Sequence, residues 1–232
     1  MARLRRIVMP GHAHVVIHRG RSGQAVFRDA ADRETYRSRL REVARHVGVT
    51  IHAYALLPGE VRLLVAPETA TGLADLMQGI GRHYVRAFNR KYQCTGTPWE
   101  GRFRSTVVEG GSQFLNCMRF VEGAPAESPE KPIGPAAETW SSAAHHLGLR
   151  LDPLVVDHPA FWALGNTPFE REAAYRRLAA EPFSERDVAA ILHAALNGWV
   201  IGSTEFADAA GWHAGRRPQP AKRGRPKGIA AA

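Results

Sequence analysis

Residues 49–66 read Val-Thr-Ile-His-Ala-Tyr-Ala-Leu-Leu-Pro-Gly-Glu-Val-Arg-Leu-Leu-Val-Ala. Two runs rich in β-branched and apolar residues, 49–57 and 61–66, lie on either side of Pro58-Gly59. Proline and glycine favour tight turns, and apolar runs of this length favour strands. The stretch therefore predicts two antiparallel strands joined as a hairpin.

The sequence on both sides of this hairpin has the period of an α-helix. Before it, apolar side chains recur at helical spacing between Asp29 and Gly48. Asp29, with Asp32 three residues on, is typical of an N-cap, and glycine is typical of a helix end. After the hairpin, a second apolar stripe with the same spacing covers residues 73–88. Both segments are predicted to be amphipathic helices.

Two more strands are predicted further outward, at 14–18 and 103–108. Ser112 is expected to cap a third helix, which continues to about Glu122. The order strand, helix, strand, strand, helix, strand is that of a ferredoxin-like βαββαβ fold. We therefore predict an α+β protein with an antiparallel sheet and helices on one face. The other face is expected to be free for nucleic acid or for a site.

The rest of the chain divides by composition. Residues 123–138 contain four prolines and two glycines, which predicts a linker or a long loop. The predicted division is a ferredoxin-like domain at 1–122, a linker with a Trp-Ser-Ser segment at 123–150, a helical extension at 151–212 and a disordered basic tail at 213–232. Within the extension, Thr167, Ser184 and Ser203 are predicted helix caps.

Charge and composition limit the classes of function and partner that the sequence allows. The chain has 232 residues, of which 44% are apolar, and an excess of 31 Lys and Arg over 22 Asp and Glu. A net charge of +9 favours a polyanion such as nucleic acid. A membrane-surface protein is the alternative, but it would need an amphipathic anchor helix. No apolar run is long enough to span a membrane. Pro10, Gly11 and two histidines interrupt residues 7–17, so no signal peptide is predicted and we expect a cytoplasmic protein.

Arginines supply the candidate binding surface. Arg82, Arg86 and Arg90 have i, i+4, i+8 spacing on the side of their helix opposite the apolar stripe. Other arginines lie in or near loops at strand ends, with Trp99 and Phe103 interleaved: Arg19, Arg21, Arg102 and Arg104. A solvated charged face would explain any one of them. Their clustering together with aromatic residues favours a phosphate-binding surface.

Histidines and cysteines predict no metal site. His12-Ala13-His14 has the spacing that places two imidazoles on one strand face, but this spacing alone is weak support for a metal. His145 and His146 are neighbours, which should point to different sides of a regular element. Structural roles are preferred for both pairs. The two cysteines form no CxxC motif and are expected to be reduced thiols.

Several motifs in a fixed order carry a family resemblance. The most specific is Trp-Glu-Gly-Arg-Phe-Arg at 99–104. The others are Leu-Leu-Pro-Gly-Glu-Val-Arg-Leu-Leu at 56–64, the Gly-Arg-His-Tyr segment that begins at 81, Cys-Met-Arg-Phe-Val-Glu at 117–122 and Trp-Ser-Ser-Ala at 140–143. Together they resemble the REP-associated tyrosine transposases, a branch of the single-strand HUH transposases related to insertion sequence 200. The resemblance covers about residues 1–150.

This resemblance implies a known chemistry. In the family, two histidines flanking a hydrophobic residue on the third strand hold a divalent metal. A tyrosine on the helix after the fourth strand attacks a DNA phosphate and forms a phosphotyrosine link. A polar residue four positions later can complete the metal site. In this sequence those positions are Glu60, Arg62, Phe120 and Ala124. We therefore expect that the metal, the nucleophile and the catalytic activity are lost, and that no cofactor is used.

Two other tyrosines, Tyr84 and Tyr54, are candidates for a replacement nucleophile. Tyr84 falls on an apolar stripe and is predicted to lie in the core. Tyr54 alternates with Ala53 and Ala55 on a strand and could reach the predicted open face. Nothing in the sequence pairs it with a metal, so a rebuilt site is the less favoured interpretation.

The tail suggests contacts to duplex DNA. Residues 215–227 contain six cations and no acid. Arg223-Gly224-Arg225-Pro226 resembles the core of an AT-hook, in which arginines follow the floor of a narrow minor groove. A generic basic tail is the equal alternative, with Arg223 and Arg225 binding DNA in either case.

These observations lead to one functional hypothesis and two alternatives. The hypothesis is an inactive, transposase-derived DNA-binding protein that holds hairpin or single-stranded DNA, with tail contacts to duplex. The first alternative is an active transposase or nickase with a rebuilt site, and the second is an RNA-binding module. No membrane partner is expected. Family members can act as dimers, so the resemblance allows a homodimer.

Overall fold

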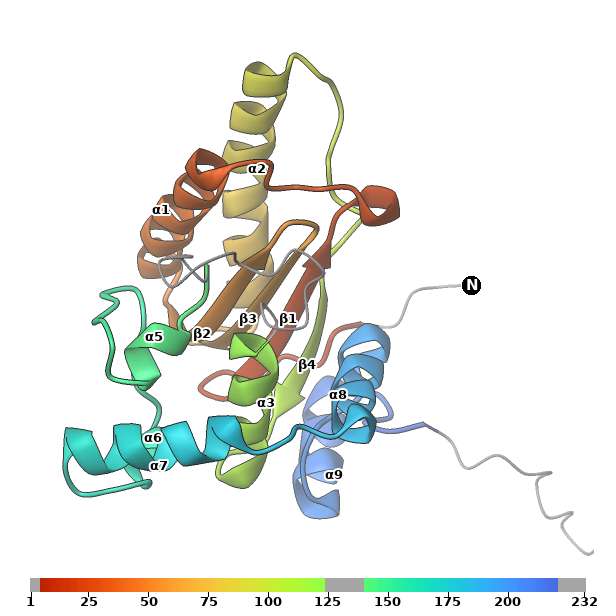
Figure 1. The fold of residues 1–232 in the computed structure, drawn as a ribbon. Coiled ribbons are helices and arrows are strands. Elements are labelled where there is room, and N and C mark those ends of the chain that lie inside the picture. Colours follow the sequence, from red (N-terminus) through yellow and green to blue (C-terminus); the bar gives the residue numbers. More distant parts are fainter. Residues whose placement is uncertain (1–4, 124–139, 221–232) are drawn as a thin grey trace, which may run out of the picture.

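The computed structural model describes residues 5–123 and 140–220 (Figure 1). The first part contains β1 (Ala13–Arg19), a 3-10 turn η1 (Arg21–Gly23), α1 (Ala30–His46), β2 (Val49–Leu57), β3 (Glu60–Pro67), α2 (Gly72–Tyr92), β4 (Arg104–Val108) and α3 (Ser112–Glu122). The second part contains α5 (Ala143–His146), α6 (Pro159–Trp162), α7 (Pro168–Ala180), α8 (Glu185–Asn197) and α9 (Thr204–Ala214).

The sheet has the predicted ferredoxin-like topology. Its strand order is β2-β3-β1-β4, and every pair of neighbours is antiparallel. β2 and β3 form the predicted hairpin around Pro58-Gly59, with Leu57 opposite Glu60. Val16 of the inner strand β1 pairs with Leu63 on one side and with Ser105 on the other. The α+β fold predicted from the sequence is confirmed.

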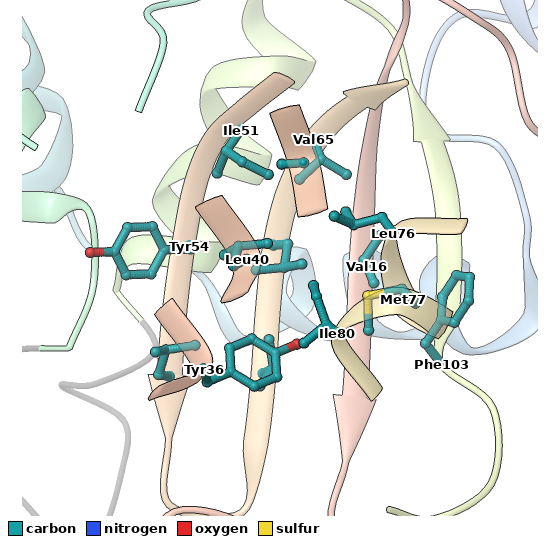
Figure 2. Packing of buried hydrophobic residues seen from close by; sticks show 14 of the residues in the cluster. Val16, Tyr36, Leu40, Ile51, Tyr54, Val65, Leu76, Met77, Ile80 and Phe103 are labelled. Atoms are coloured by element: carbon teal, nitrogen blue, oxygen red, sulfur yellow. The ribbon is translucent and has the colours of Figure 1, made fainter. Parts of the chain in front are cut away.

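The first sheet face is covered by α1 and α2 (Figure 1). Asp29 caps α1 as predicted, because its side chain accepts a hydrogen bond from the Asp32 backbone N–H at 2.9 Å. Figure 2 shows Tyr36 and Leu40 of α1 and Ile80 of α2 packed against the strands. These side chains are at most 1% exposed, so the two apolar stripes supply the main core.

The second sheet face is not free, contrary to the prediction. Helix α3 lies across it (Figure 1), and its apolar side chains pack on small strand residues such as Ala53 and Ala55. Tyr175 of α7 and Ile191 of α8 join the same cluster. The sequence prediction failed here because it assigned α3 no packing partner. Packing an apolar helix face on an apolar sheet face buries both surfaces away from water, which stabilises the fold.

The C-terminal helices begin at the predicted caps. Thr167, Ser184 and Ser203 each accept a hydrogen bond from a backbone N–H in the first turn of α7, α8 and α9. Helix α3 differs slightly, since Ser112 is its first residue and Gly111 its N-cap. The division of the chain at residue 122 stays a prediction.

Part of the predicted disordered tail is folded. Residues 213 and 214 belong to α9, and the Arg216 guanidinium donates to the backbone oxygens of Arg5 and Gly198 at 2.6 and 3.1 Å. The Val200 N–H donates to the Pro218 oxygen. The prediction missed this because long-range contacts, rather than local composition, order the segment. Arg223 and Arg225, like the predicted linker residues 124–138, lie outside the described residues.

Candidate functional site

Glu60 and Arg62 occupy the two family histidine positions and lie on the same face of β3. The strand period of two places both side chains toward α3, next to Leu64 of the same face. Arg62 Nε donates to Glu60 Oε1 at 2.6 Å, and Arg19 Nε donates to Glu60 Oε2 at 2.6 Å. Both oxygens of this carboxylate are therefore bound by guanidinium groups.

Phe120, at the family tyrosine position, completes this arrangement from α3. Its side chain is fully buried. The Arg62 guanidinium carbon lies 4.3 Å from the centre of the Phe120 ring, and Arg62 Nη1 donates to the Phe120 backbone oxygen at 3.2 Å. The structure thus brings together three of the four predicted site positions, which we call the remnant site: Glu60, Arg62 and Phe120. Ala124, the fourth, lies outside the described residues.

Neither tyrosine considered as a replacement reaches the remnant site. Tyr54 was expected on the face now covered by α3, but it lies in the core under α1 and α2, because a register irregularity between Ile51 and Ala53 shifts the alternation (Figure 2). Its hydroxyl donates to Asp152 Oδ2 at 2.6 Å, and burial raises the pKa of this hydroxyl. Tyr84 is in the core as predicted, and its hydroxyl donates to the Val26 oxygen.

The predicted arginine surface is exposed along α2. Arg82, Arg86 and Arg90 are all exposed, and none has a carboxylate within salt-bridge distance among residues 5–123 and 140–220. Because their positive charges face water, this stripe is able to bind phosphates.

The arginines at the strand ends differ from one another. Arg21, Arg102 and Arg104 are exposed, whereas Arg19 is paired with Glu60. Arg104 Nη1 also donates to the Leu196 oxygen at 3.4 Å.

The aromatic residues between these arginines do not form a stacking surface. Trp99 and Phe103 are 3% and 8% exposed and belong to the main core, contrary to their predicted role. Trp99 stacks on the His18 ring, with the ring centres 4.1 Å apart. The aromatic and basic residues alternate here because the aromatic side chains are buried in the core and the arginine side chains are exposed. Nucleic-acid bases therefore cannot stack on the Trp99 and Phe103 rings.

The His12-His14 pair has a structural role, as preferred from the sequence. The ring of His14 lies between two backbone groups: Nδ1 donates to the His12 oxygen at 2.8 Å, and Nε2 accepts from the Met9 N–H at 3.2 Å. These bonds require the neutral ring. Burial lowers the pKa of His14 to about 4, which agrees with this assignment.

His145 and His146 do converge, which the sequence prediction excluded. Their Nε2 atoms lie 3.2 and 3.6 Å from Asp157 Oδ1. His145 Nδ1 accepts from the Asp152 N–H, so its proton is on Nε2 and is donated to Asp157. This hydrogen bond lowers the pKa of Asp157. The three side chains form a hydrogen-bonded network, and they bring one potential ligand atom each within 4.8 Å of one another.

A buried carboxylate connects α3 to the extension. Glu122 Oε1 accepts from Ser142 Oγ and from His146 Nδ1 at 2.5 and 2.6 Å, and Glu122 Oε2 accepts from the Tyr175 hydroxyl at 2.6 Å. All four side chains are buried. These hydrogen bonds hold α3, the helix that carries Phe120, against the C-terminal extension. From the sequence, Glu122 was only one residue of a family motif and had no predicted role of its own.

Comparisons with known proteins identify the family. The fold is that of a transposase. The family model described as "Transposase IS200 like" matches residues 8–123, half of the chain. The chain therefore belongs to the IS200-like transposase family, and the resemblance inferred from the motifs is confirmed. None of the curated proteins matches it.

One solved structure supports the fold, and a second has a lower similarity. A REP-associated tyrosine transposase bound to a REP hairpin has 15% identity to this chain and a TM-score of 0.53, covering 69% of this chain and 93% of that chain. A candidate transposase from Deinococcus radiodurans R1 has 18% identity and a TM-score of 0.34, covering 47% of this chain and 87% of that chain. No described helix has the length and apolar character that crossing a membrane requires.

Proposed function

We propose that this transposase-family chain is a DNA-binding protein that no longer cuts DNA by the family mechanism. The observation that carries the proposal is the contact between Arg62 and Phe120, 4.3 Å from guanidinium carbon to ring centre. A phenyl ring has no oxygen with which to attack a phosphate, so no phosphotyrosine link can form at this position.

The remnant site also does not fit the family's divalent metal. Glu60 offers oxygens, but both are held by arginines at 2.6 Å. Arg62 has no acceptor or lone pair to give to a metal, and its charge would repel a dication a few ångströms away. Since Arg62 is 8% exposed, this repulsion would be only weakly screened by water.

The DNA-binding part of the proposal rests on the α2 stripe and on charge. Arg82, Arg86 and Arg90 lie on one helix face, and their guanidinium groups have no acidic partner among the described residues. The chain carries a net charge of +9. The REP hairpin in the structure of similar fold supports a hairpin as the first ligand to test, with single-stranded DNA as the second.

The test of lost cleavage is covalent-adduct formation on hairpin DNA with magnesium or manganese. We expect no adduct from the wild-type protein. We also expect none from Phe120→Tyr, because this variant restores the hydroxyl but leaves Arg62 at the metal position. An adduct from the wild-type protein would refute the proposal and favour an active enzyme with a rebuilt site. An adduct from Phe120→Tyr alone would refute the argument about the metal.

The test of binding is competition between DNA and RNA hairpins of matched sequence. Preferential binding of the DNA hairpin, maintained in the presence of a chelator, is the expected result. Preferential binding of the RNA hairpin would favour the RNA-binding alternative. No binding of either hairpin would contradict a nucleic-acid function.

A further inference from the structure

A cavity of about 350 Å³ lies at the start of β4, where the N-terminal segment meets the end of α8. Five arginines and a serine are among its lining residues: Arg5, Arg6, Arg102, Arg104, Ser105 and Arg216. No acidic side chain is among the described residues that line it. We call it the arginine cavity. Arg216 and the residues after α8 come from the C-terminal part of the chain, so the extension completes it.

Backbone contacts hold the arginines of this cavity in place. The Arg6 guanidinium lies 3.8 Å from the centre of the Phe103 ring and donates to the Phe103 oxygen at 2.9 Å. Arg216 donates to the Arg5 and Gly198 oxygens, and Arg104 donates to the Leu196 oxygen. These carbonyl groups orient the Arg104 and Arg216 guanidinium groups without neutralising their charge. The site is therefore pre-organised for an anion.

Arg216 and Arg104 have no acidic partner in the part of the chain that the structure describes. Burial lowers the pKa of Arg216, because the fold has removed part of its hydration. A positive charge that has lost water and has no counter-ion favours the approach of an anionic ligand.

We propose that the arginine cavity binds a phosphate group of a nucleic-acid strand, with the C-terminal extension forming one wall of the site. The assignment of this phosphate to a nucleic-acid strand, rather than to a free phosphate compound, rests on the proposed function. A water molecule takes up roughly 30 Å³ of liquid, so the cavity has room for a phosphate and part of its sugar. Arg102 and Arg104 were predicted to bind phosphate from the sequence, whereas no sequence signal places Arg5, Arg6 or Arg216 beside them.

The test compares affinity for hairpin DNA with a single-stranded extension, measured by fluorescence anisotropy over a range of salt concentrations. Arg104→Ala should weaken binding about tenfold and reduce the slope of log Kd against log salt by about one phosphate contact. Arg102→Ala should weaken binding and reduce this slope by a similar amount, because Arg102 lines the same cavity. Arg41→Ala and Ser38→Ala on α1 are matched exposed controls and should bind like the wild type.

A second measurement separates this proposal from the proposed function. Pyrophosphate should raise the melting temperature of the wild type and of the controls, but not of Arg102→Ala/Arg104→Ala. If DNA binds all variants equally, the cavity proposal is overturned while DNA binding stands. If the wild type binds no DNA, the proposed function fails and the strand phosphate fails with it. Pyrophosphate stabilisation lost in the double variant would then identify a site for free phosphate compounds.

Discussion

Replacing Glu122 with leucine should cost a large part of the free energy of unfolding. The carboxylate is 3% exposed and accepts hydrogen bonds from Ser142 and His146 at the two ends of α5 and from Tyr175 of α7. Leucine has a similar volume but leaves the three donors without their acceptor. Ser142 Oγ has a second acceptor in the Tyr54 oxygen at 3.4 Å, so the main loss falls on His146 and Tyr175.

The size of the effect follows from these contacts. Each buried polar group left without a partner costs about 1–3 kcal/mol. Two such groups together give about 2–6 kcal/mol. The total free energy of unfolding of a native protein is about 5–15 kcal/mol. The variant should therefore be close to unfolding at 37 °C, and α3 with Phe120 should lose its fixed position.

Urea denaturation at pH 7.5, followed by circular dichroism, measures this loss. Tyr175→Phe is the matched control, because it removes one hydroxyl and leaves the other two donors on Glu122. It should cost about 1 kcal/mol. A loss below 1 kcal/mol for Glu122→Leu would refute the reasoning, since it would mean that the network contributes little to the fold.

Three further predictions concern pH, salt and the tail. Acid should destabilise the protein through His14: its pKa is about 4 in the fold against 6.5 unfolded, so stability is complete above pH 6.5 and falls as the pH drops toward 4. The loss at pH 5 is about 2 kcal/mol, and His14→Gln should flatten this dependence in urea titrations. Changing Arg82, Arg86 and Arg90 to alanine should reduce the salt slope of hairpin binding by roughly two to three; an unchanged slope would mean that the stripe is only solvated. Removing residues 221–232 should weaken duplex binding, more on A·T-rich than on G·C-rich DNA if the AT-hook interpretation holds, whereas equal losses would indicate a plain basic tail.

The elements of the fold were predictable because their signals are local. The hairpin at 49–66 has alternating strand residues around Pro58-Gly59, and α1 and α2 have apolar stripes with clear ends. The covered second face was not predicted, since α3 makes its contacts across long sequence separations. A cue was present, however: Phe114, Cys117 and Val121 give α3 an apolar face of its own, which a helix beside an open sheet would leave in water.

The candidate site was predictable only in part, for the same reason. The strand period places Glu60 and Arg62 on one face, and the family motif adds Phe120. The arginine cavity joins residues from both ends of the chain, such as Arg5 and Arg216, which are 211 positions apart. No spacing rule connects such residues, so a structure was needed to bring them together.

The three substitutions of the remnant site depend on one another physically. A guanidinium that is 8% exposed needs a counter-charge, and Glu60 at 2.6 Å provides it. The Phe120 ring contributes about 2 kcal/mol of cation–π attraction to a charge that has lost most of its water. Restoring a histidine at position 62 alone would leave the ring and Glu60 without the cation that both contact. A metal, in turn, could not bind while Arg62 remains. If the chain has lost cleavage as proposed, restoring it would therefore require several changes at once, because a single change at this site leaves the partners of the changed side chain without their contact.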